Sequence, residues 1–408
     1  IGLTGHTLRY RYRLYSHPHH KAALARAFGC ARVVWNDALA LCQRLYKRGE
    51  KYLGVAELQK RCITQAKQSP ERSWLAEVSN VPLVQSVRDL DKAFRAWWGC
   101  LKGKGRGKVR APRFKRRSNS QSMRFTRNAF WVEGHTLRLT KVGSIPIVWS
   151  RELPAEPSSV TIMKDEAGRY CASFVVEVER PKLPASSKTV GVGIDLGLAS
   201  LAVTSEGEKI APPKFLRSAL QRIRRLQRSL SRKEKGSHNR QKARLRLARA
   251  HVQVADQRLD HLHKLSTRLI RENQTVVLED LNVSGMVKNR KLARAIADAG
   301  WRLLRTLLES KAEIYGREVK IISRWEPTSQ TCSACGHRDG KKSLSVRAWR
   351  CSACGAEHDR DVNAARNILA AGLAARLNAC GAEGKTSVLA SGSEAGTHLN
   401  QGVQPCTT

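Results

Sequence analysis

The stretch CSACGAEHDRDVNAARNI, residues 351–368, places two cysteines directly before two aspartates, and both residue types can bind metal ions. Cys351 and Cys354 have the spacing of a metal knuckle, and Cys332 and Cys335 repeat it upstream to give C-x2-C-x15-C-x2-C. This spacing is typical of a zinc site with four thiolate ligands. Because four protein ligands leave no coordination position open, we expect one structural Zn²⁺ that takes no part in the chemistry.

Three carboxylates occupy positions that suit a second metal site. Asp195 ends the apolar strand in GIDLG, Glu279 ends the apolar strand in VVLED, and Asp361 opens the predicted helix RDVNAARNI. This arrangement is that of RNase H-like nucleases, whose carboxylates converge on two Mg²⁺ ions roughly 3.5–4 Å apart. Clustered anions of this kind cannot all stay ionised without such cations. His358 and Asp359, beside Asp361, either support this site or are ordinary loop residues.

The predicted chemistry is therefore hydrolysis of a phosphodiester with two Mg²⁺ ions, or with Mn²⁺ in their place. One ion would activate a water molecule, and the other would stabilise the leaving 3′ oxygen during in-line attack. Arg360 is a candidate to hold the scissile phosphate.

Each carboxylate also has an alternative role. Asp361 can be a helix N-cap, a position at which Asp is favoured. Asp195 can be a turn residue before Gly197, and Glu279 can pair with a neighbouring arginine. The occurrence of all three acids in this order and on these elements favours the nuclease interpretation.

The charge of the chain indicates its partner. Its 408 residues are enough for two or three domains, and 74 Lys and Arg against 34 Asp and Glu give a net charge of +40. Such an excess repels itself unless a polyanion neutralises it, and each phosphate contact also releases counterions. We therefore expect a nucleic acid as partner. A membrane is not expected, because the basic runs lack a one-sided apolar face and no apolar run approaches roughly 18 residues.

The cysteines and the first residues indicate a compartment. Eleven cysteines without an export signal favour metal ligands or free thiols over a disulfide framework. The stretch IGLTGHTLRYRYRLY has arginines where a signal peptide needs an apolar core. We expect a cytoplasmic protein that is not secreted.

Hydrophobic periodicity changes character at a predicted linker, RPKLPASSK, residues 180–188. Before it, residues 7–15 alternate as a half-buried strand whose open face carries arginines. A helical pattern covers 21–100, and a Gly- and Arg-rich loop covers 102–122. The strands RFTRNAFWV and LRLTKVGSIPIVW follow, and then a hairpin formed by SVTIMK and YCASFVVEVE.

After the linker, residues 190–204 predict two short strands around a tight turn. Apolar residues recur at three- and four-residue steps through 214–272, which predicts a helical pair whose other faces carry arginines. A buried strand TVVLED, a helix near 291–316 and a strand EVKIIS precede the cysteine insert. The Gly/Ser/Thr-rich residues 381–408 are expected to be disordered.

Several motifs occur together in one order: GIDLGLASLAVT, VLEDLNVSGM, ADAGW, RWEPTSQTCSACGH and EHDRDVNAARNI. With them the chain resembles TnpB, the family of transposon-encoded, RNA-guided nucleases from which the type V CRISPR effectors descend. The earlier stretches RYRLYSHPHHKAALARAFGCARVVWNDAL, QSVRDLDKAFRAWW and PRFKRRSNSQSMRFT are also similar to the family, so the resemblance covers residues 7 to 375.

The resemblance implies an α/β multidomain fold, in which a RuvC (RNase H-like) nuclease carries a zinc ribbon. A β-barrel wedge domain with a helical recognition insert would precede it. The implied domains are the wedge at 1–17 and 121–183, the helical recognition domain at 18–120, the RuvC-like domain at 189–323 and 356–380 with a basic helical hairpin at 214–272, the zinc ribbon at 324–355, and the tail at 381–408.

The resemblance also implies the partners. A member of this family binds a guide RNA from its own transposon end, opens double-stranded DNA beside a short adjacent motif and cuts both strands, as a monomer on one RNA. Gln85, Phe125, Thr126 and Arg127 match positions that contact the adjacent motif. The basic loop and hairpin would grip RNA and heteroduplex, through Arg113, Lys115, Arg116, Arg117, Arg222, Arg225 and Arg244.

Three other functions compete with a guided endonuclease. A guide-dependent DNA-binding repressor would lack a carboxylate, yet all three are present. RNase H-like transposases that join DNA ends usually present Asp, Asp and Glu, whereas the order here is Asp, Glu and Asp. A small type V CRISPR effector would share the chemistry and differ in the origin of its guide.

Overall fold

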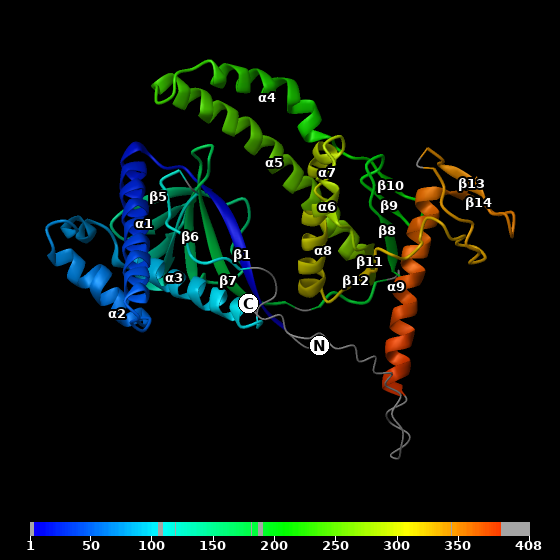
Figure 1. The fold of residues 1–408 in the computed structure, drawn as a ribbon, viewed down its shortest axis with the longest axis horizontal. Helices are drawn as coiled ribbons and strands as arrows, with labels where there is room; N and C mark the ends of the chain where they lie inside the picture. Colours follow the sequence, from blue (N-terminus) through cyan, green and yellow to red (C-terminus); the bar gives the residue numbers. More distant parts are fainter. Residues whose placement is uncertain are drawn as a thin grey trace, which may run out of the picture. The chain divides into compact units, whose positions relative to one another are not determined.

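The computed structural model describes residues 4–104, 109–118, 120–180, 182–186, 191–343 and 345–384. The chain divides into two compact units (Figure 1). The first consists of Ile1–Lys182 and Phe215–Asp260, and the second of Leu183–Lys214 and His261–Thr408. Among the described residues, no helix is long and apolar enough to cross a membrane.

A seven-stranded antiparallel sheet forms the centre of the first unit, in the order β2-β6-β7-β1-β5-β4-β3. Its first strand confirms the predicted alternation, because Tyr10, Tyr12 and Leu14 are buried and the arginines between them are exposed. The strands are β1 (Thr4–Leu14), β2 (Gln121–Thr126), β3 (Phe130–Glu133), β4 (Thr136–Leu139), β5 (Gly143–Val148), β6 (Ser159–Lys164) and β7 (Tyr170–Arg180).

This sheet curls into a nearly closed barrel, as predicted. Its two outermost strands are β2 and β3, yet β2 ends at Thr126 and β3 begins at Phe130. The three residues Arg127–Ala129 between them span far less than the width of seven strands, so the two edges must lie close together. The predicted hairpin of β6 and β7 is confirmed as an antiparallel pair.

Helices pack against the barrel in one continuous hydrophobic core. The predicted helical stretch contains α1 (Pro18–Lys47), α2 (Val55–Gln59) and α3 (Asn80–Leu101), with short π and 3₁₀ turns between α2 and α3. Leu24, Val34, Leu83, Val87 and Leu90 are fully buried between the helices and the sheet.

The predicted helical pair is present as α4 (Phe215–Ser231) and α5 (His238–Glu272). A narrow apolar seam of Ile223, Ala250 and Val254 joins the two helices, while most of their arginines are exposed. Residues Phe215–Asp260 belong to the barrel unit, whereas the sequence grouped the whole pair with the nuclease. One reason is the Arg169 guanidinium, which joins the β6–β7 turn to α5 by a 2.5 Å ion pair with Asp256.

A five-stranded sheet forms the centre of the second unit, in the order β10-β9-β8-β11-β12. The two short strands predicted at 190–204 are confirmed as β8 (Val192–Asp195) and β9 (Ala202–Thr204), which pair antiparallel across six connecting residues. Strand β11 (Thr275–Glu279) runs parallel to both β8 and β12 (Glu318–Ile322), and the short β10 (Lys209–Ile210) lies at the edge.

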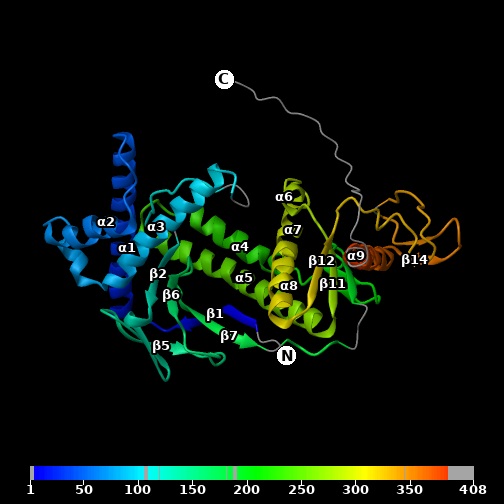
Figure 2. The ribbon, with the colours of Figure 1, turned by 90° about the horizontal axis from the view of Figure 1, so that it is seen from below.

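Helices cover both faces of this sheet. Helix α8 (Trp301–Tyr315) and the end of α5 lie on one face, and α9 (Arg360–Gly384) lies on the other (Figures 1 and 2). The single helix expected near 291–316 is wrong. It is divided into α7 (Ala293–Ala299) and α8 because Gly300 has φ +70°, a left-handed conformation that ends a helix. A short α6 (Val283–Met286) precedes them.

The cysteine insert lies between β12 and α9. It contains a two-stranded sheet of β13 (Ala348–Arg350) and β14 (Glu357–Asp359). Helix α9 continues to Gly384, through the first residues of the expected tail, and residues 385–408 lie outside the described residues. Residues 181, 187 and 188 of the predicted linker also lie outside them.

Candidate functional site

Asp195 and Glu279 leave the second sheet at the same edge. Strands β8 and β11 are parallel, and their register pairs Val276 with Val192 and Leu278 with Ile194. The next position along each strand is therefore Asp195 on β8 and Glu279 on β11. Neighbouring strands lie about 4.8 Å apart, so the two carboxylates start from adjacent positions at the carboxyl ends of parallel strands. This edge is where ligands bind in open α/β sheets.

Both side chains point toward the α9 face of the sheet. Side chains two residues apart on a strand share a face. Gly193, two residues before Asp195, faces the backbone of α9, and Val277, two residues before Glu279, packs in the cluster that contains Ile368 of α9. The sequence alone predicts that both acids lie at the ends of strands. That they lie on the same face of the sheet follows only from the parallel register of β8 and β11.

Two glycines let α9 approach this face closely. A Cβ atom on Gly193 would lie 2.1 Å from the Ala365 carbonyl oxygen and 2.7 Å from the Leu369 amide nitrogen. A Cβ atom on Gly372 would lie 2.5 Å from Cγ1 of Val277. Only glycine fits at these two positions, and the contact brings the first turn of α9, with Asp361, to the strand acids.

Asp195 lies within the electrostatic influence of the other two carboxylates. Burial raises the pKa of Asp195 to about 7, and the negative charges of Asp361 and Glu279 contribute to this rise. The guanidinium of Arg360 opposes this shift. The pKa of Glu279 is also raised, first by burial and then by the charge of Asp280. The site therefore concentrates more negative charge than its own surroundings neutralise.

The structure assigns the cap of α9 to Asp359 and not to Asp361. The Asp359 carboxylate accepts hydrogen bonds of 3.1 Å from the amides of Asp361 and Val362, and it pairs with Lys209 at 2.5 Å. The carboxylate of Asp361, in the first turn, is contacted by Arg347 Nη1 at 3.4 Å. Asp361 is thus available for a ligand, and the helix keeps a favourable anion at its N-terminus.

The neighbouring acids Glu279 and Asp280 have different environments. Asp280 pairs with Arg324 and, at 2.8 Å, with Arg305, and both hydrogen bonds lower its pKa. Within the described residues, Glu279 makes no ion pair with an arginine. The alternative role considered for Glu279 therefore belongs to Asp280.

The four cysteines of the insert form one cluster, with all four sulfur atoms within 4.8 Å of one another. The Sγ atoms of Cys332 and Cys354 are 3.7 Å apart, as are those of Cys335 and Cys351. A tetrahedral site with zinc–sulfur distances of about 2.3 Å has edges of roughly 3.8 Å. The cluster fits a zinc ion, as predicted.

Hydrogen bonds from α9 hold this cluster against the carboxylate site. Asn363 accepts from the Ser333 amide and donates to the Thr331 carbonyl, both at 2.8 Å. Asn367, one turn later, donates to the Thr331 and Thr328 carbonyls at 2.7 Å. The buried His358 places Nε2 3.0 Å from Cys332 Sγ. The zinc knuckle and Asp361 are therefore attached to the same two turns of one helix.

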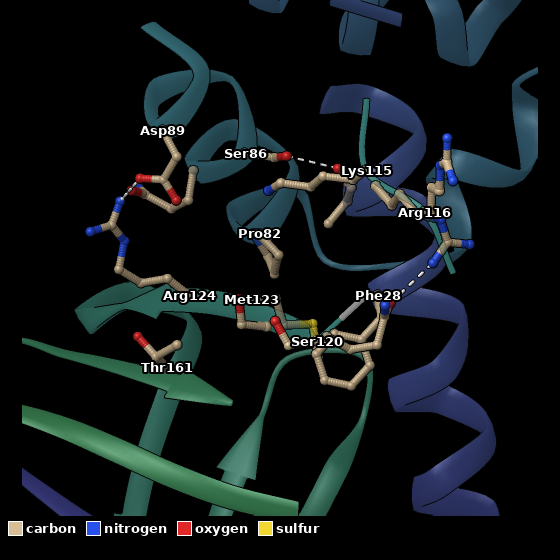
Figure 3. A pocket seen from close by; sticks show the side chains of 15 residues that line it. Phe28, Pro82, Ser86, Asp89, Lys115, Arg116, Ser120, Met123, Arg124 and Thr161 are labelled. Atoms are coloured by element: carbon tan, nitrogen blue, oxygen red, sulfur yellow. Dashed lines mark hydrogen bonds and ion pairs between the residues drawn. The ribbon is translucent and has the colours of Figure 1, made fainter. Parts of the chain in front are cut away.

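A separate cavity of about 300 Å³ lies in the first unit, between α1, α3 and β2. Gln85, which is 7% exposed, lines it. Lys115 and Arg116 also line it (Figure 3). Arg124 joins Asp89 on its other side by a 2.5 Å ion pair (Figure 3). The cavity thus combines a buried amide with basic side chains.

The other residues that matched the adjacent-motif positions differ in exposure. Thr126 and Gln85 line a second, open cavity beside the first. Arg127 pairs with Glu156 at 3.1 Å. Phe125 is fully buried in the barrel core, so its side chain presents no surface to a ligand in this structure.

The remaining predicted basic residues lie in three places. In the described loop after α3, Trp35 Nε1 donates to the Arg113 carbonyl, Lys115 stacks on the Trp35 ring at 3.8 Å, and Arg117 is exposed. On the helical pair, Arg222, Arg225 and Arg244 are exposed. Arg360 donates to the Ser343 carbonyl at 2.6 Å, so its guanidinium also fastens the cysteine insert.

Three protein-family models together match more than half of the chain. Residues 173–290 match the family described as "Probable transposase", residues 301–368 match "Cas12f1-like, TNB domain", and residues 6–51 match "Helix-turn-helix domain". In the structure, residues 6–51 form most of β1 and the single long helix α1.

Two relatives span nearly the whole chain. A protein of Streptomyces pristinaespiralis, named as a candidate RNA-guided DNA endonuclease, is 47% identical over 91% of this chain and 90% of its own. InsQ of Escherichia coli K12, named likewise, is 32% identical over 91% of this chain and 93% of its own. The chain belongs to the TnpB family. A TnpB-like protein of Acanthamoeba polyphaga mimivirus, L79, is 28% identical over 55% of the chain and 45% of its own.

Among solved structures, this TnpB chain is similar to a chain in the Cas12f1–sgRNA–target DNA complex. The TM-score is 0.49 at 12% identity, covering 90% of this chain and 99% of the other. CasPhi-2 (Cas12j) bound to crRNA gives a TM-score of 0.38 at 10% identity, covering 90% and 98%.

Sequence reasoning missed several residues around the carboxylates of this TnpB protein. Gly193 and Gly372 set the distance of α9 from the sheet, and Asn363 and Asn367 attach the cysteine insert to it. A signal for the asparagines was available, since two amides four residues apart share one face of a helix. No local pattern indicated Arg347, because its contact with Asp361 depends on how the insert folds back.

Proposed function

We propose that this TnpB chain is an RNA-guided DNA endonuclease that cleaves both strands of a target duplex with Asp195, Glu279 and Asp361. The observation that carries the proposal is the convergence of these three carboxylates, at the carboxyl ends of two parallel strands and the start of α9. Family membership supports the RNA guide and the DNA target, since relatives that align with nearly the whole chain are named for that activity. The net charge of +40 supports a polyanionic partner.

The three carboxylates fit two Mg²⁺ ions. Hard oxygen ligands suit Mg²⁺, and the pKa of Asp195 is raised by burial and by the charges of Asp361 and Glu279, which bound cations would neutralise. When bound, such ions activate water and stabilise the leaving oxygen in phosphodiester hydrolysis. Asp195 and Glu279 would provide ligands from the sheet, and Asp361 would provide one from the opposite helix. Arg347, which contacts Asp361, and Arg360 would lie beside the scissile phosphate.

The barrel unit would hold the nucleic acids. Its cavity beside Gln85 and Arg116 has the polar lining to read an adjacent DNA motif, with Thr126 and Arg127 nearby. The exposed arginines of α4 and α5 would bind phosphates of the RNA and the heteroduplex. We also retain a monomer on one guide RNA and the predicted domain boundaries, except that Phe215–Asp260 belong to the unit of the barrel.

A library experiment tests the proposal. The protein is produced together with RNA from the end of its own transposon, and a plasmid library presents a fixed target beside randomised bases. In Mg²⁺, the wild type is expected to deplete one set of adjacent motifs, and Asp195→Ala is expected to deplete none. Equal binding by both proteins without cleavage would contradict the nuclease and leave the guided repressor.

Loss of zinc is expected to slow cleavage without removing a catalytic group. Cys351→Ser should reduce the cleavage rate by about ten- to a hundredfold, because the knuckle positions α9 and Asp361 through Asn363. Cleavage kinetics and zinc content would be measured for this variant and for Cys171→Ser, a cysteine of the barrel. Wild-type rates in zinc-free protein would refute the positioning role.

A further inference from the structure

A cavity of about 420 Å³ adjoins the carboxylate site on the α8 side of the sheet. Glu279 forms part of its wall, so the cavity opens beside one of the three proposed metal ligands. The rest of the wall comes from α6 and the residues before it, from α8, and from single residues at the ends of β8, β11 and β12. Besides Glu279, its polar lining residues are Asn282, Ser284, Arg302, Arg305, Thr306, Glu309 and Arg324.

Two of the three arginines are held in place. Asp280 accepts from Arg305 Nη1 at 2.8 Å and pairs with Arg324, and Glu309 accepts from Arg305 Nε at 2.8 Å. Each guanidinium has five N–H donors, so both keep donors for a ligand. The shared carboxylate fixes their orientation before a ligand arrives, which lowers the entropic cost of binding.

The third arginine carries uncompensated charge. Arg302 is exposed, and within the described residues it has no ion pair. Its position on α8 places it one turn before Thr306, on the wall of the cavity. The cavity therefore presents a cation toward solvent next to a cluster of carboxylates, which is the charge pattern expected for a phosphodiester that approaches bound metal ions.

An exposed tryptophan follows one of the lining residues in the chain. Trp325 directly follows Arg324, and 85% of its surface is exposed, whereas Trp301 inside the cavity wall is 3% exposed. The loop that bears it is ordered by hydrogen bonds from the Trp325 amide to Ser323 and from Asn367 to the Thr328 carbonyl. A large ring held outside the core is disfavoured in water but provides a stacking platform for a nucleic-acid base.

We propose that this cavity and Trp325 form a subsite for single-stranded DNA next to the cut position. Arg302, with the remaining donors of Arg305 and Arg324, would contact phosphates, and Trp325 would stack on one base. The subsite thus sets the path of the strand across Glu279. It rests on the proposed function for its substrate, because the strand that it holds is the one delivered to the carboxylates.

A cross-linking experiment tests this subsite separately from cleavage. Full-length Asp195→Asn protein, purified with its guide RNA, is mixed without Mg²⁺ with a short DNA strand that carries 5-iodouracil. Irradiation joins that base to an aromatic side chain stacked on it, and peptide mapping locates the link. We expect the link at Trp325, and a link confined to other residues would overturn the proposal.

Binding of the same strand gives a second readout. Trp325→Ala and Arg302→Ala are each expected to weaken binding by about tenfold, as for loss of a stacked base or a phosphate contact. Trp131→Ala is the matched control, because Trp131 is also exposed but lies on the barrel. Melting temperatures establish that each variant is folded, and Trp325→Phe should restore most of the affinity.

The two proposals can fail separately. Cross-linking at Trp325 with no cleavage by the wild type would contradict the nuclease and keep the strand subsite. Cleavage by the wild type that Trp325→Ala and Arg302→Ala both leave unchanged, with unchanged binding of the strand, would overturn the subsite and keep the nuclease.

Discussion

Asp195→Asn is expected to reduce cleavage of double-stranded target DNA by at least about a thousandfold, because the amide removes one charged ligand from a two-metal site. The substitution is nearly isosteric, so the sheet and α9 should keep their positions. Cleavage would be followed under single-turnover conditions with guide RNA in place. Asp256→Asn is the control and should retain most of the activity. It removes a carboxylate from α5 that is not among the three proposed metal ligands.

The same substitution is expected to stabilise the metal-free protein above pH 7. The pKa of Asp195 in the folded protein is about 7, above its ordinary value, so the folded state keeps a proton that the unfolded state has lost. Stability of the wild type therefore falls as the pH rises from about 4 to 7, by roughly 1.4 kcal/mol for each unit of the pKa difference. The amide of the variant has no proton to lose in this range and escapes this penalty.

Thermal unfolding in chelator checks this prediction. At pH 8 the melting temperature of Asp195→Asn should exceed that of the wild type, and at pH 4 the difference should vanish. Addition of Mg²⁺ at pH 8 should raise the melting temperature of the wild type more than that of the variant. A variant less stable than the wild type at pH 8 without metal would contradict the buried cluster of like charges.

Gly193→Ala is expected to abolish cleavage although it changes no polar group. The added Cβ would meet backbone atoms of Ala365 and Leu369, which cannot rotate away as a side chain could. Either α9 moves outward with Asp361, or the helix and sheet stay in place under strain. We expect a loss of about 3 kcal/mol in the free energy of unfolding, at the upper end for overpacking.

Gly5→Ala provides the matched control. Gly5 also lies in a strand, β1, but a Cβ there would meet no atom within 4 Å. Its stability and its cleavage should stay close to those of the wild type. A Gly193→Ala protein with wild-type activity and melting temperature would show that α9 does not depend on this close contact.

Several parts of the fold could be predicted because their signals are local. The alternation of Tyr10, Tyr12 and Leu14 with arginines specified β1, since the period of a half-buried strand is two residues. The spacing of the cysteines specified the metal cluster, since two C-x2-C pairs bring four thiolates to one ion. The split at Gly300 was missed, because the apolar pattern continues across it and only the backbone angle reveals the break.

The sequence by itself determined the composition of the candidate site. Asp195 and Glu279 end apolar strands, and Asp361 begins a helix. Local hydrophobicity predicts the first two positions, and the residues that follow the second knuckle predict the third. The family motifs give the same three residues. Their chemistry follows from residue type, because a carboxylate carries its charge and its metal preference wherever it lies.

Only the tertiary structure decided which neighbours these carboxylates have. The parallel register of β8 and β11 put Asp195 and Glu279 on one face, and the glycines at 193 and 372 set the distance of α9. Asp280 pairs with the neighbouring arginines, and Asp359 caps α9. Glu279 and Asp361 therefore remain available to bind a ligand. Such choices depend on contacts between residues far apart in the chain, and no local pattern records them.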